Sequence, residues 1–201
     1  MIAKNIVSTS SVLGGILCLA STGVFAKEDI AQRFHTTYRS LKSIECTFTR
    51  EGTINGSLIA IKGKGYDIRV GDRRIVSDGV LIWNITEGTK TVVINKVQSN
   101  SQDLSIEQMF FTMMSIYVPS VVKESGAVTT LRLLPPSPQA IVGGVEQADV
   151  SIDRSLKVKR IETRDGGQTS IWTVTSMKLN RVGATSFSYK PLSGWNVVDL
   201  R

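Results

Sequence analysis

The chain has few of the residues on which most enzyme sites depend. It contains one histidine, His35, and two cysteines, Cys18 and Cys46, among 201 residues. It has no Gly-x-Ser-x-Gly nucleophile motif, no glycine-rich phosphate loop and no closely spaced histidines and cysteines. These absences argue against hydrolase, nucleotide-dependent and metal-dependent chemistry. We therefore expect a protein that is not an enzyme, with no metal site and no cofactor.

No hydrophobic run in the chain is long enough to span a bilayer comfortably. The most apolar stretch extends from Val12 to Leu19, and two glycines interrupt it. Lys4 precedes this stretch and small residues ending in Ala26 follow it, which is the pattern of a secretory signal peptide. We predict that residues 1–26 are cleaved after Ala26 and that residues 27–201 form one domain. A retained N-terminal anchor is the alternative.

Cleavage of the signal peptide also determines the cysteine chemistry. It removes Cys18 and leaves Cys46 as the only thiol, which excludes a disulfide within the chain. Cys46 alternates with Ile44 and Phe48, a pattern typical of a small buried residue in a strand. Lipid attachment at Cys18 would need a small residue before it, but Leu17 occupies that position.

The chain has an excess of basic residues. Its 24 Lys and Arg against 17 Asp and Glu give a formal net charge of +7, and loss of Lys4 lowers this to +6. An exported protein does not ordinarily meet nucleic acid, so we expect no nucleic-acid partner. Anionic lipid headgroups, acidic protein partners or solubility alone would explain the charge.

Residues 28–41 have the apolar spacing of an amphipathic helix. Acidic residues stand in the expected first turn, where the helix dipole favours negative charge. Apolar and aromatic residues recur every three or four positions, at Ile30, Phe34, Tyr38 and Leu41.

Residues 104–117 predict a second helix with one continuous apolar stripe. Ser105 and Gln108 can form a capping box at its start, and Pro119 would end it. The stripe consists of Ile106, Met109, Phe110, Met113, Met114 and Tyr117.

Most of the remaining chain alternates apolar and polar residues, and glycines divide it into short runs. Asp78-Gly79 and Asp165-Gly166 lie between apolar runs and predict type I′ hairpin turns, and Gly88 marks a third hairpin. Many strands joined by hairpins tend to form a sheet that curls. We expect a mainly β (α+β) fold: an incomplete, strongly curved antiparallel β-barrel, with an N-terminal helix and a central helical lid over an apolar cavity.

The hairpin of residues 75–79, with Trp83 four residues after its glycine, resembles the V-S-D-G-x-x-x-W hairpin of the outer-membrane lipoprotein carrier family, LolA. Residues 187–199 are similar to the F-x-F-x-P-x-G-x-x-V-x-D ending of that family. Shorter matches lie at residues 43–49, 56–66 and 165–169. These matches span nearly the whole predicted domain in the right order, so the chain resembles a divergent member of the family.

The resemblance implies a function as well as a fold. It implies a periplasmic chaperone that binds the acyl chains of lipoproteins released from the inner membrane. The chaperone would receive acylated lipoproteins from an inner-membrane lipoprotein-releasing transporter and deliver them to an outer-membrane acceptor. We expect it to act as a monomer without cofactors.

The resemblance and the apolar pattern together suggest site residues. We predict a lipid-binding cavity lined by Phe48, Leu58, Tyr66, Ile68, Leu81, Trp83 and Phe187. The lid would present Ile106, Met109, Phe110, Met113 and Met114, whose methionines can repack against either an empty cavity or lipid.

One departure from the family concerns the residue that holds the lid. The family usually has an Arg-Pro pair after the Gly-x-Leu strand, and Lys62-Gly63 stands there in this chain. A lysine cannot reproduce the forked hydrogen bonding of a guanidinium group. The latch candidates are Lys62 and Arg69, and Arg50 is a further substitute.

A second function is compatible with the same open fold. The protein could be an envelope sensor or regulatory binding module that binds another amphiphile or a membrane protein. A carrier would co-purify with lipoprotein and release newly acylated lipoprotein from spheroplasts, whereas a sensor would hold a stable protein partner without such release.

Overall fold

The computed structural model describes residues 29–97, 109–183 and 185–201. Among these residues, no helix has both the length and the apolarity needed to cross a membrane. The elements are, in chain order, α1 (Ile30–Arg39), β1 (Ser43–Arg50), β2 (Ile54–Ile61), β3 (Gly65–Val70), β4 (Arg73–Ser77), β5 (Leu81–Thr86), β6 (Thr91–Lys96), the π-helical turn η1 (Met109–Met113), α3 (Met114–Ile116), β7 (Val118–Ser125), β8 (Val128–Leu134), the 3₁₀ turn η2 (Pro138–Ala140), β9 (Gln147–Asp153), β10 (Val158–Asp165), β11 (Gln168–Leu179) and β12 (Asn196–Asp199).

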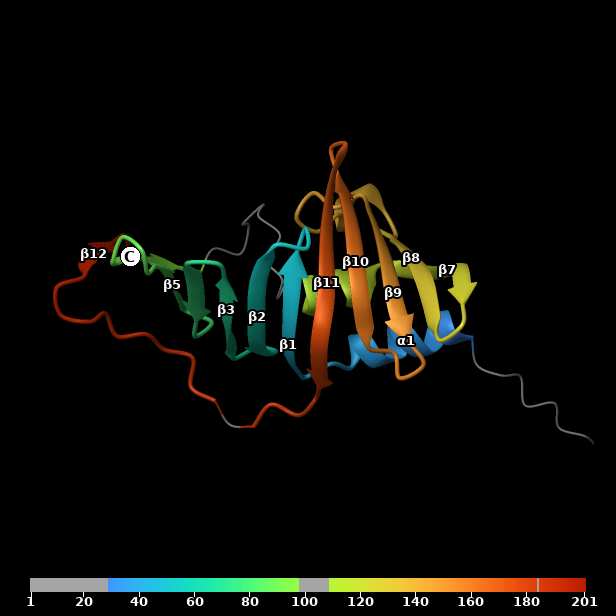
Figure 1. Ribbon diagram of the computed structural model, residues 1–201, viewed down its shortest axis with the longest axis horizontal. Helices are drawn as coiled ribbons and strands as arrows, with labels where there is room; N and C mark the ends of the chain where they lie inside the picture. Colours follow the sequence, from blue (N-terminus) through green and yellow to red (C-terminus); the bar gives the residue numbers. More distant parts are fainter. Residues whose placement is uncertain (1–28, 98–108, 184) are drawn as a thin grey trace, which may run out of the picture.

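The strands form one open sheet in the order β12-β6-β5-β4-β3-β2-β1-β11-β10-β9-β8-β7 (Figure 1). The predicted mainly β fold with an open, curved sheet is confirmed. One pairing differs from the prediction, because β12 runs parallel to β6. The chain between β11 and β12 passes from one rim of the sheet to the other, so the last strand starts at the same rim as β6.

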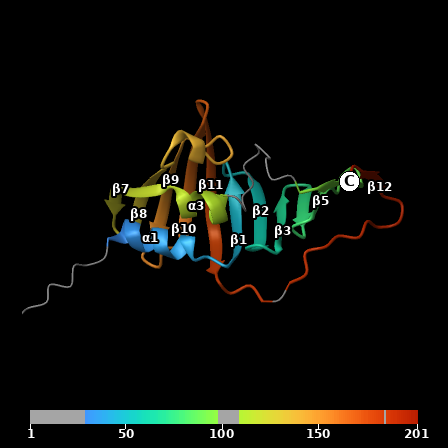
Figure 2. The ribbon, with the colours of Figure 1, turned by 180° about the vertical axis from the view of Figure 1, so that it is seen from behind.

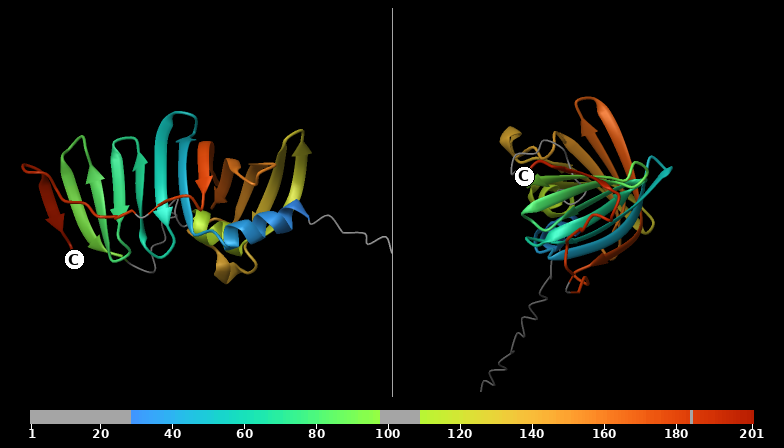
Figure 3. Two further views of the ribbon diagram at one scale, coloured as in Figure 1. Left: turned by 90° about the horizontal axis from the view of Figure 1, so that it is seen from below. Right: turned by 90° about the vertical axis from the view of Figure 1, so that its left-hand side faces the viewer.

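The helices cover one face of one half of the sheet. Helix α1 and the segment η1–α3 lie across β7 to β11 and β1, whereas β3 to β6 extend beyond them (Figures 2 and 3). The predicted N-terminal helix is confirmed: the Asp29 carboxylate caps it by accepting from the Ala31 N–H at 3.2 Å. Its apolar side, with Phe34 and Tyr38 fully buried, faces the sheet.

The second predicted helix is shorter and less regular than its sequence pattern indicates. Residues 104–108, including Ile106, lie outside the described residues. The described part begins with a π turn over Met109–Met113, which buries every residue of the turn except Thr112. The wider turn therefore adds Phe111 to the apolar stripe predicted for a regular α-helix. We call residues 109–117 the plug.

The sheet has apolar side chains on both faces, and they form two separate clusters. In β2, Leu58 and Ala60 belong to the cluster beneath the helices, whereas Ile59 and Ile61 pack against the other cluster. Successive side chains of a strand point to opposite faces. The clusters therefore lie on opposite sides of the sheet, which we call the helix face and the outer face.

The outer-face cluster is completed by the chain that joins β11 to β12. This connection follows the lower rim of the sheet in Figure 1 before it reaches β12. Its Phe187 is buried in the cluster, and Tyr189 and Trp195 pack around it. The strand residues of the cluster are Val76, Trp83, Ile85, Val92 and Ile94.

Cys46 is expected to be nearly inert in the folded protein. Burial, together with the negative charge of Glu45, raises the pKa of its thiol to about 12 from an ordinary value of 9.0. At about pH 8 the thiolate fraction then falls roughly 1,000-fold below that of the unfolded chain, and alkylation slows in proportion. Iodoacetamide labelling without and with urea measures the ratio of the alkylation rates of the folded and the unfolded chain. A native rate within about tenfold of the unfolded rate would contradict the burial of this thiol.

Candidate functional site

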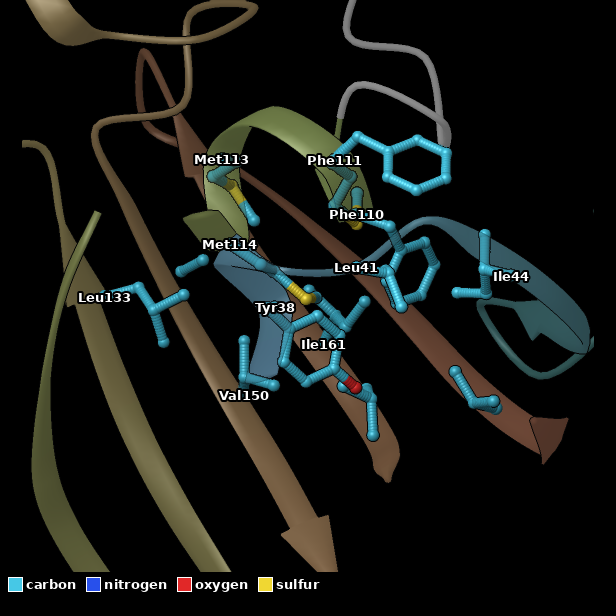
Figure 4. Packing of buried hydrophobic residues seen from close by; sticks show 14 of the residues in the cluster. Tyr38, Leu41, Ile44, Phe110, Phe111, Met113, Met114, Leu133, Val150 and Ile161 are labelled. Atoms are coloured by element: carbon cyan, nitrogen blue, oxygen red, sulfur yellow. The ribbon is translucent and has the colours of Figure 1, made fainter. Parts of the chain in front are cut away.

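The space between the plug and the helix face is filled by side chains. Met109, Phe110, Met113 and Met114 are all at most 1% exposed. In Figure 4 the side chains of Met114 and Tyr38 lie between the helices and the strands of the sheet. The plug thus occupies the place where the sequence predicts an apolar cavity.

A small recess remains beside the plug. Its volume is about 10 Å³, and its walls are Phe48, Met109, Phe110, Ile161, Trp172 and Val174. A space of this size holds about one water molecule. Among the described residues the predicted cavity is therefore closed, and an acyl chain could enter this space only if the plug moved away.

The predicted cavity residues do not share one site. Phe48, Leu58 and Ile68 belong to the cluster on the helix face, and Tyr66 packs against it. The other three predicted residues, Leu81, Trp83 and Phe187, belong to the cluster on the outer face.

Strand register explains this division. Trp83 lies opposite Val76 in β4, and Val76 lies opposite Asp67 in β3. Asp67 stands between Tyr66 and Ile68, whose side chains contribute to the helix face. Directly paired residues share a face and adjacent residues do not. The prediction that Trp83 lines the same cavity as Ile68 is therefore wrong.

The predicted latch residues do not hold the plug. Arg69 alternates with Ile68 and Val70, so its side chain lies on the outer face, where its Nε is 3.9 Å from the Asp67 carboxylate. Lys62 lies in the exposed turn between β2 and β3. In the part of the chain that the structure describes, neither side chain bonds to residues 109–117. The predicted lid also includes residues 104–108, which lie outside the described residues, so the latch assignment stays a prediction.

Two other contacts tether the plug. The Tyr117 hydroxyl donates to the Val145 carbonyl oxygen and accepts from the Val142 N–H at 3.0 Å. Burial raises the pKa of this hydroxyl, which therefore stays protonated and can donate. On the other side, His35 Nε2 lies 3.0 Å from the Ser115 carbonyl oxygen and links α1 to the plug. Tyr117 belongs to the predicted apolar stripe, but its pattern gave no sign of this polar role.

Two nitrogen donors near the recess have no hydrogen-bond partner among the described residues. They are Arg50 Nε and Trp172 Nε1, and both atoms are buried; the Glu51 carboxylate lies 3.6 Å from Arg50 Nε, within ion-pair distance. The Arg50 guanidinium carbon lies 5.2 Å from the centre of the Trp172 ring, in a cation–π arrangement. A ligand with acceptor oxygens would satisfy both donors, whereas a purely hydrocarbon ligand would satisfy neither. The sequence suggests Arg50 only as a latch substitute and does not predict its position beside Trp172.

The Arg132–Asp149 ion pair lies on the outer face, because Arg132 stands between Leu131 and Leu133 of the helix-face cluster. Hydrogen bonds from Arg132 Nε and Nη2, each 2.9 Å long, hold the pKa of Asp149 below its ordinary value. In the described ranges, no group of three or more His, Cys, Asp or Glu side chains could hold a metal ion.

The Asp149 pair predicts a pH-dependent contribution to stability. Its carboxyl pKa is depressed by folding, so the contribution is present above the unfolded value of about 3.9 and is lost as the pH falls through the folded value. We expect Asp149→Asn to lower the urea midpoint at about pH 7 and to match the wild type at about pH 2. Urea unfolding at both pH values measures this. An equal difference at both would show that the charge of Asp149 is not responsible.

Comparison with known proteins identifies the fold and no more. No known protein family matches the chain, and no curated protein matches it. An uncharacterized conserved protein from Thermus thermophilus has a similar structure, with 12% identity and a TM-score of 0.51, over 85% of this chain and 99% of that chain. At this identity the likeness extends to the fold alone.

Two weaker likenesses have TM-scores below 0.5, too low to support an argument. One is a putative outer membrane lipoprotein-sorting protein domain from Vibrio parahaemolyticus, with 10% identity and a TM-score of 0.37, over 75% of this chain and 91% of that chain. The other is in the Pseudomonas aeruginosa MucA/MucB complex, with 15% identity and a TM-score of 0.39, over 76% of this chain and 56% of that chain. The fold of the chain is thus similar to that of the Thermus protein.

Proposed function

We propose that this protein is an exported carrier that binds the acyl chains of lipoproteins on its helix face. It would take them from an inner-membrane releasing transporter and deliver them to an outer-membrane acceptor. The observation that supports this proposal is the plug: a short, methionine-rich helical segment that covers an apolar sheet face and is tethered by few polar contacts. When the plug leaves, the face it covered becomes a binding surface for hydrocarbon.

The energies of opening and of lipid binding are comparable. Fully burying one large apolar side chain is worth about 1.5–3 kcal/mol, so exposing the six buried plug side chains costs roughly 9–18 kcal/mol. Burying an acyl chain of about fifteen carbons gains roughly 12 kcal/mol. The plug therefore competes with the acyl chain for the same face. Such competition keeps the net affinity moderate, which a carrier needs in order to release its cargo.

The chemistry of the plug and of the recess also suits an acylated ligand. Methionine side chains are flexible and polarisable, so Met109, Met113 and Met114 can repack when lipid enters. At the recess, Arg50 Nε and Trp172 Nε1, which have no hydrogen-bond partner in the described part of the chain, would donate to the ester or amide oxygens that join acyl chains to a lipoprotein. Hydrocarbon and acceptor oxygens would then be bound side by side.

Photo-crosslinking with a co-expressed lipoprotein tests this proposal. A photoreactive residue at Phe48, on the helix face, is expected to form an adduct, and one at Met113 should do so if the plug stays in contact with the lipid. The same residue at Trp83, on the outer face, is the matched control and should give none. Adducts at Trp83 without adducts at Phe48 would overturn the assignment of the helix face.

The edge strand β7 favours a second candidate function, that of a regulatory module which binds a membrane protein. This strand ends the sheet, and it exposes Val118 and Val122 to 56% and 45%. An unpaired edge with exposed valines can accept a strand from a partner. Release of newly acylated lipoprotein from spheroplasts would support the carrier, whereas a stable complex with a protein partner and no release would support the regulator.

A further inference from the structure

The two rims of the sheet differ in charge. At the lower rim in Figure 1, β1 begins and β11 ends, with the β2–β3 and β4–β5 turns on one side of them and the β9–β10 and β7–β8 turns on the other. In the described chain, the connections at this rim contain one acidic residue, Asp78. They contain six basic residues, Lys42, Lys62, Lys64, Arg154, Lys157 and Arg181.

The upper rim has the opposite balance. There the described β1–β2, β3–β4, β5–β6, β8–β9 and β10–β11 connections contain one basic residue, Lys90. Their acidic residues are Glu51, Asp72, Glu87 and Glu146. Among these connections, positive charge therefore gathers at the lower rim and negative charge at the upper rim, a division that an excess of charge for solubility alone would not require.

Hydrogen bonds hold three of the basic segments together. The Lys62 N–H donates to the Lys42 carbonyl oxygen at 2.9 Å, and the Lys42 N–H donates to Asn180 Oδ1 at 2.8 Å. Asn180 precedes Arg181, so charges from the α1–β1 loop, the β2–β3 turn and the end of β11 meet at one place. In the described chain, none of the six basic residues has a carboxylate within 4.0 Å, the limit for an ion pair. Their charges are free to meet an external anion.

Exposed valines lie beside these lysines. Val80 stands in the β4–β5 turn and is 69% exposed. The neighbouring Gly79 packs on the backbone of Lys64: a Cβ added to this glycine would lie 3.5 Å from the Lys64 carbonyl oxygen. The Val97 N–H donates to the Val80 carbonyl oxygen at 2.9 Å, and Val97 is 41% exposed. Lysines with exposed apolar residues between them are typical of surfaces that rest in a membrane interface.

We infer that the lower rim docks on an anionic phospholipid surface. The basic residues follow an edge of the sheet and do not converge on a pocket, which fits a broad, laterally uniform array of phosphate groups. The valines would enter the headgroup layer, a contact that an acidic protein surface does not offer. The inference goes beyond the carrier function and stands without it, because it requires no acyl chain to bind.

Vesicle sedimentation tests this inference with the full exported chain. The probes are vesicles of phosphatidylcholine alone and of phosphatidylcholine mixed with phosphatidylglycerol, at low and high salt. The wild type is expected to bind the anionic vesicles at low salt, to leave them at high salt, and not to bind phosphatidylcholine. Absence of binding to anionic vesicles would overturn the inference and favour an acidic protein partner.

Two double variants, each of which removes two positive charges, distinguish an effect of the lower rim from an effect of net charge. Lys62→Gln with Lys64→Gln removes two lower-rim charges and should weaken anionic-vesicle binding roughly tenfold or more. Lys90→Gln with Arg164→Gln removes the same charge near the upper rim and should leave binding within about twofold. Equal losses in both variants would mean that overall charge, and not the lower rim, attracts the protein. All four residues lie at turns or strand ends, and thermal unfolding verifies that both variants fold.

Discussion

Replacing Tyr117 with phenylalanine is expected to tighten the binding of a long-chain acyl probe by roughly 5- to 150-fold. The change removes the hydroxyl that bonds to the Val145 carbonyl oxygen and the Val142 N–H. In the closed protein these groups then lose a partner, at a cost of about 1–3 kcal/mol, whereas in the open protein they can reach water. The closed state is destabilised relative to the open one, so the binding-competent fraction rises.

Tyr38→Phe is the matched control for Tyr117→Phe. The Tyr38 hydroxyl is also buried, but it donates to the Leu156 carbonyl oxygen and does not bond to the plug. Both variants should lower the melting temperature, while only Tyr117→Phe should change the affinity for a fluorescent fatty-acid probe. If both variants lose stability and neither changes probe affinity, the plug does not control access to the helix face.

The local elements were predictable because their signals lie within a few residues. The structure has hairpins at both Asp78-Gly79 and Asp165-Gly166, and both glycines have positive φ. The predicted type I′ turns centred on the Asp-Gly pairs are wrong, because neither aspartate has positive φ, and in the second hairpin the positive-φ pair is Gly166-Gly167. The three- and four-residue spacing of Phe34 and Tyr38 likewise defines the buried side of α1. Such features depend on neighbouring residues alone, so no knowledge of the rest of the fold is required.

The face on which a strand residue lies was not predictable in the same way. Ile75 and Val76 are adjacent, and either could face the helices by its apolar character. Which face each residue takes depends on the strand register of three successive pairings, β1–β2, β2–β3 and β3–β4. A shift of one residue in any of these pairings would exchange the faces of Ile75 and Val76. The apolar hairpin around Trp83 therefore revealed a strand pair without revealing its inner side.

The state of the cavity depends on still longer-range contacts. The plug is closed because its Tyr117 meets the loop at Val142 and Val145, and because Ser115 meets His35 on α1. These partners are separated from the plug by between 25 and 80 positions in the chain. An apolar stripe on a helix predicts that something covers it, but it does not distinguish a lid over lipid from a plug that fills the space itself.

Phe187→Ala is expected to destabilise the protein by about 3 kcal/mol or more and to leave acyl binding unchanged. The Phe187 ring is only 5% exposed, and it packs over Gly65, where a Cβ would come within 3.0 Å of the ring. Removing it opens a cavity between the C-terminal connection and β3 to β6. Because this cluster lies on the outer face, the loss should not reach the helix face, where the proposed lipid site lies.

Urea unfolding followed by tryptophan fluorescence measures the stability loss, and crosslinking from Phe48 measures acyl binding in the same variant. Leu192→Ala is the control on the same connection: its side chain is 64% exposed, so its removal should change stability by less than about 0.5 kcal/mol. Loss of acyl crosslinking in Phe187→Ala at unchanged stability would place Phe187 in the lipid site and contradict the division into two faces. Loss of stability with unchanged acyl crosslinking would mean that the outer-face cluster stabilises β12 and its neighbours while the helix face still binds lipid.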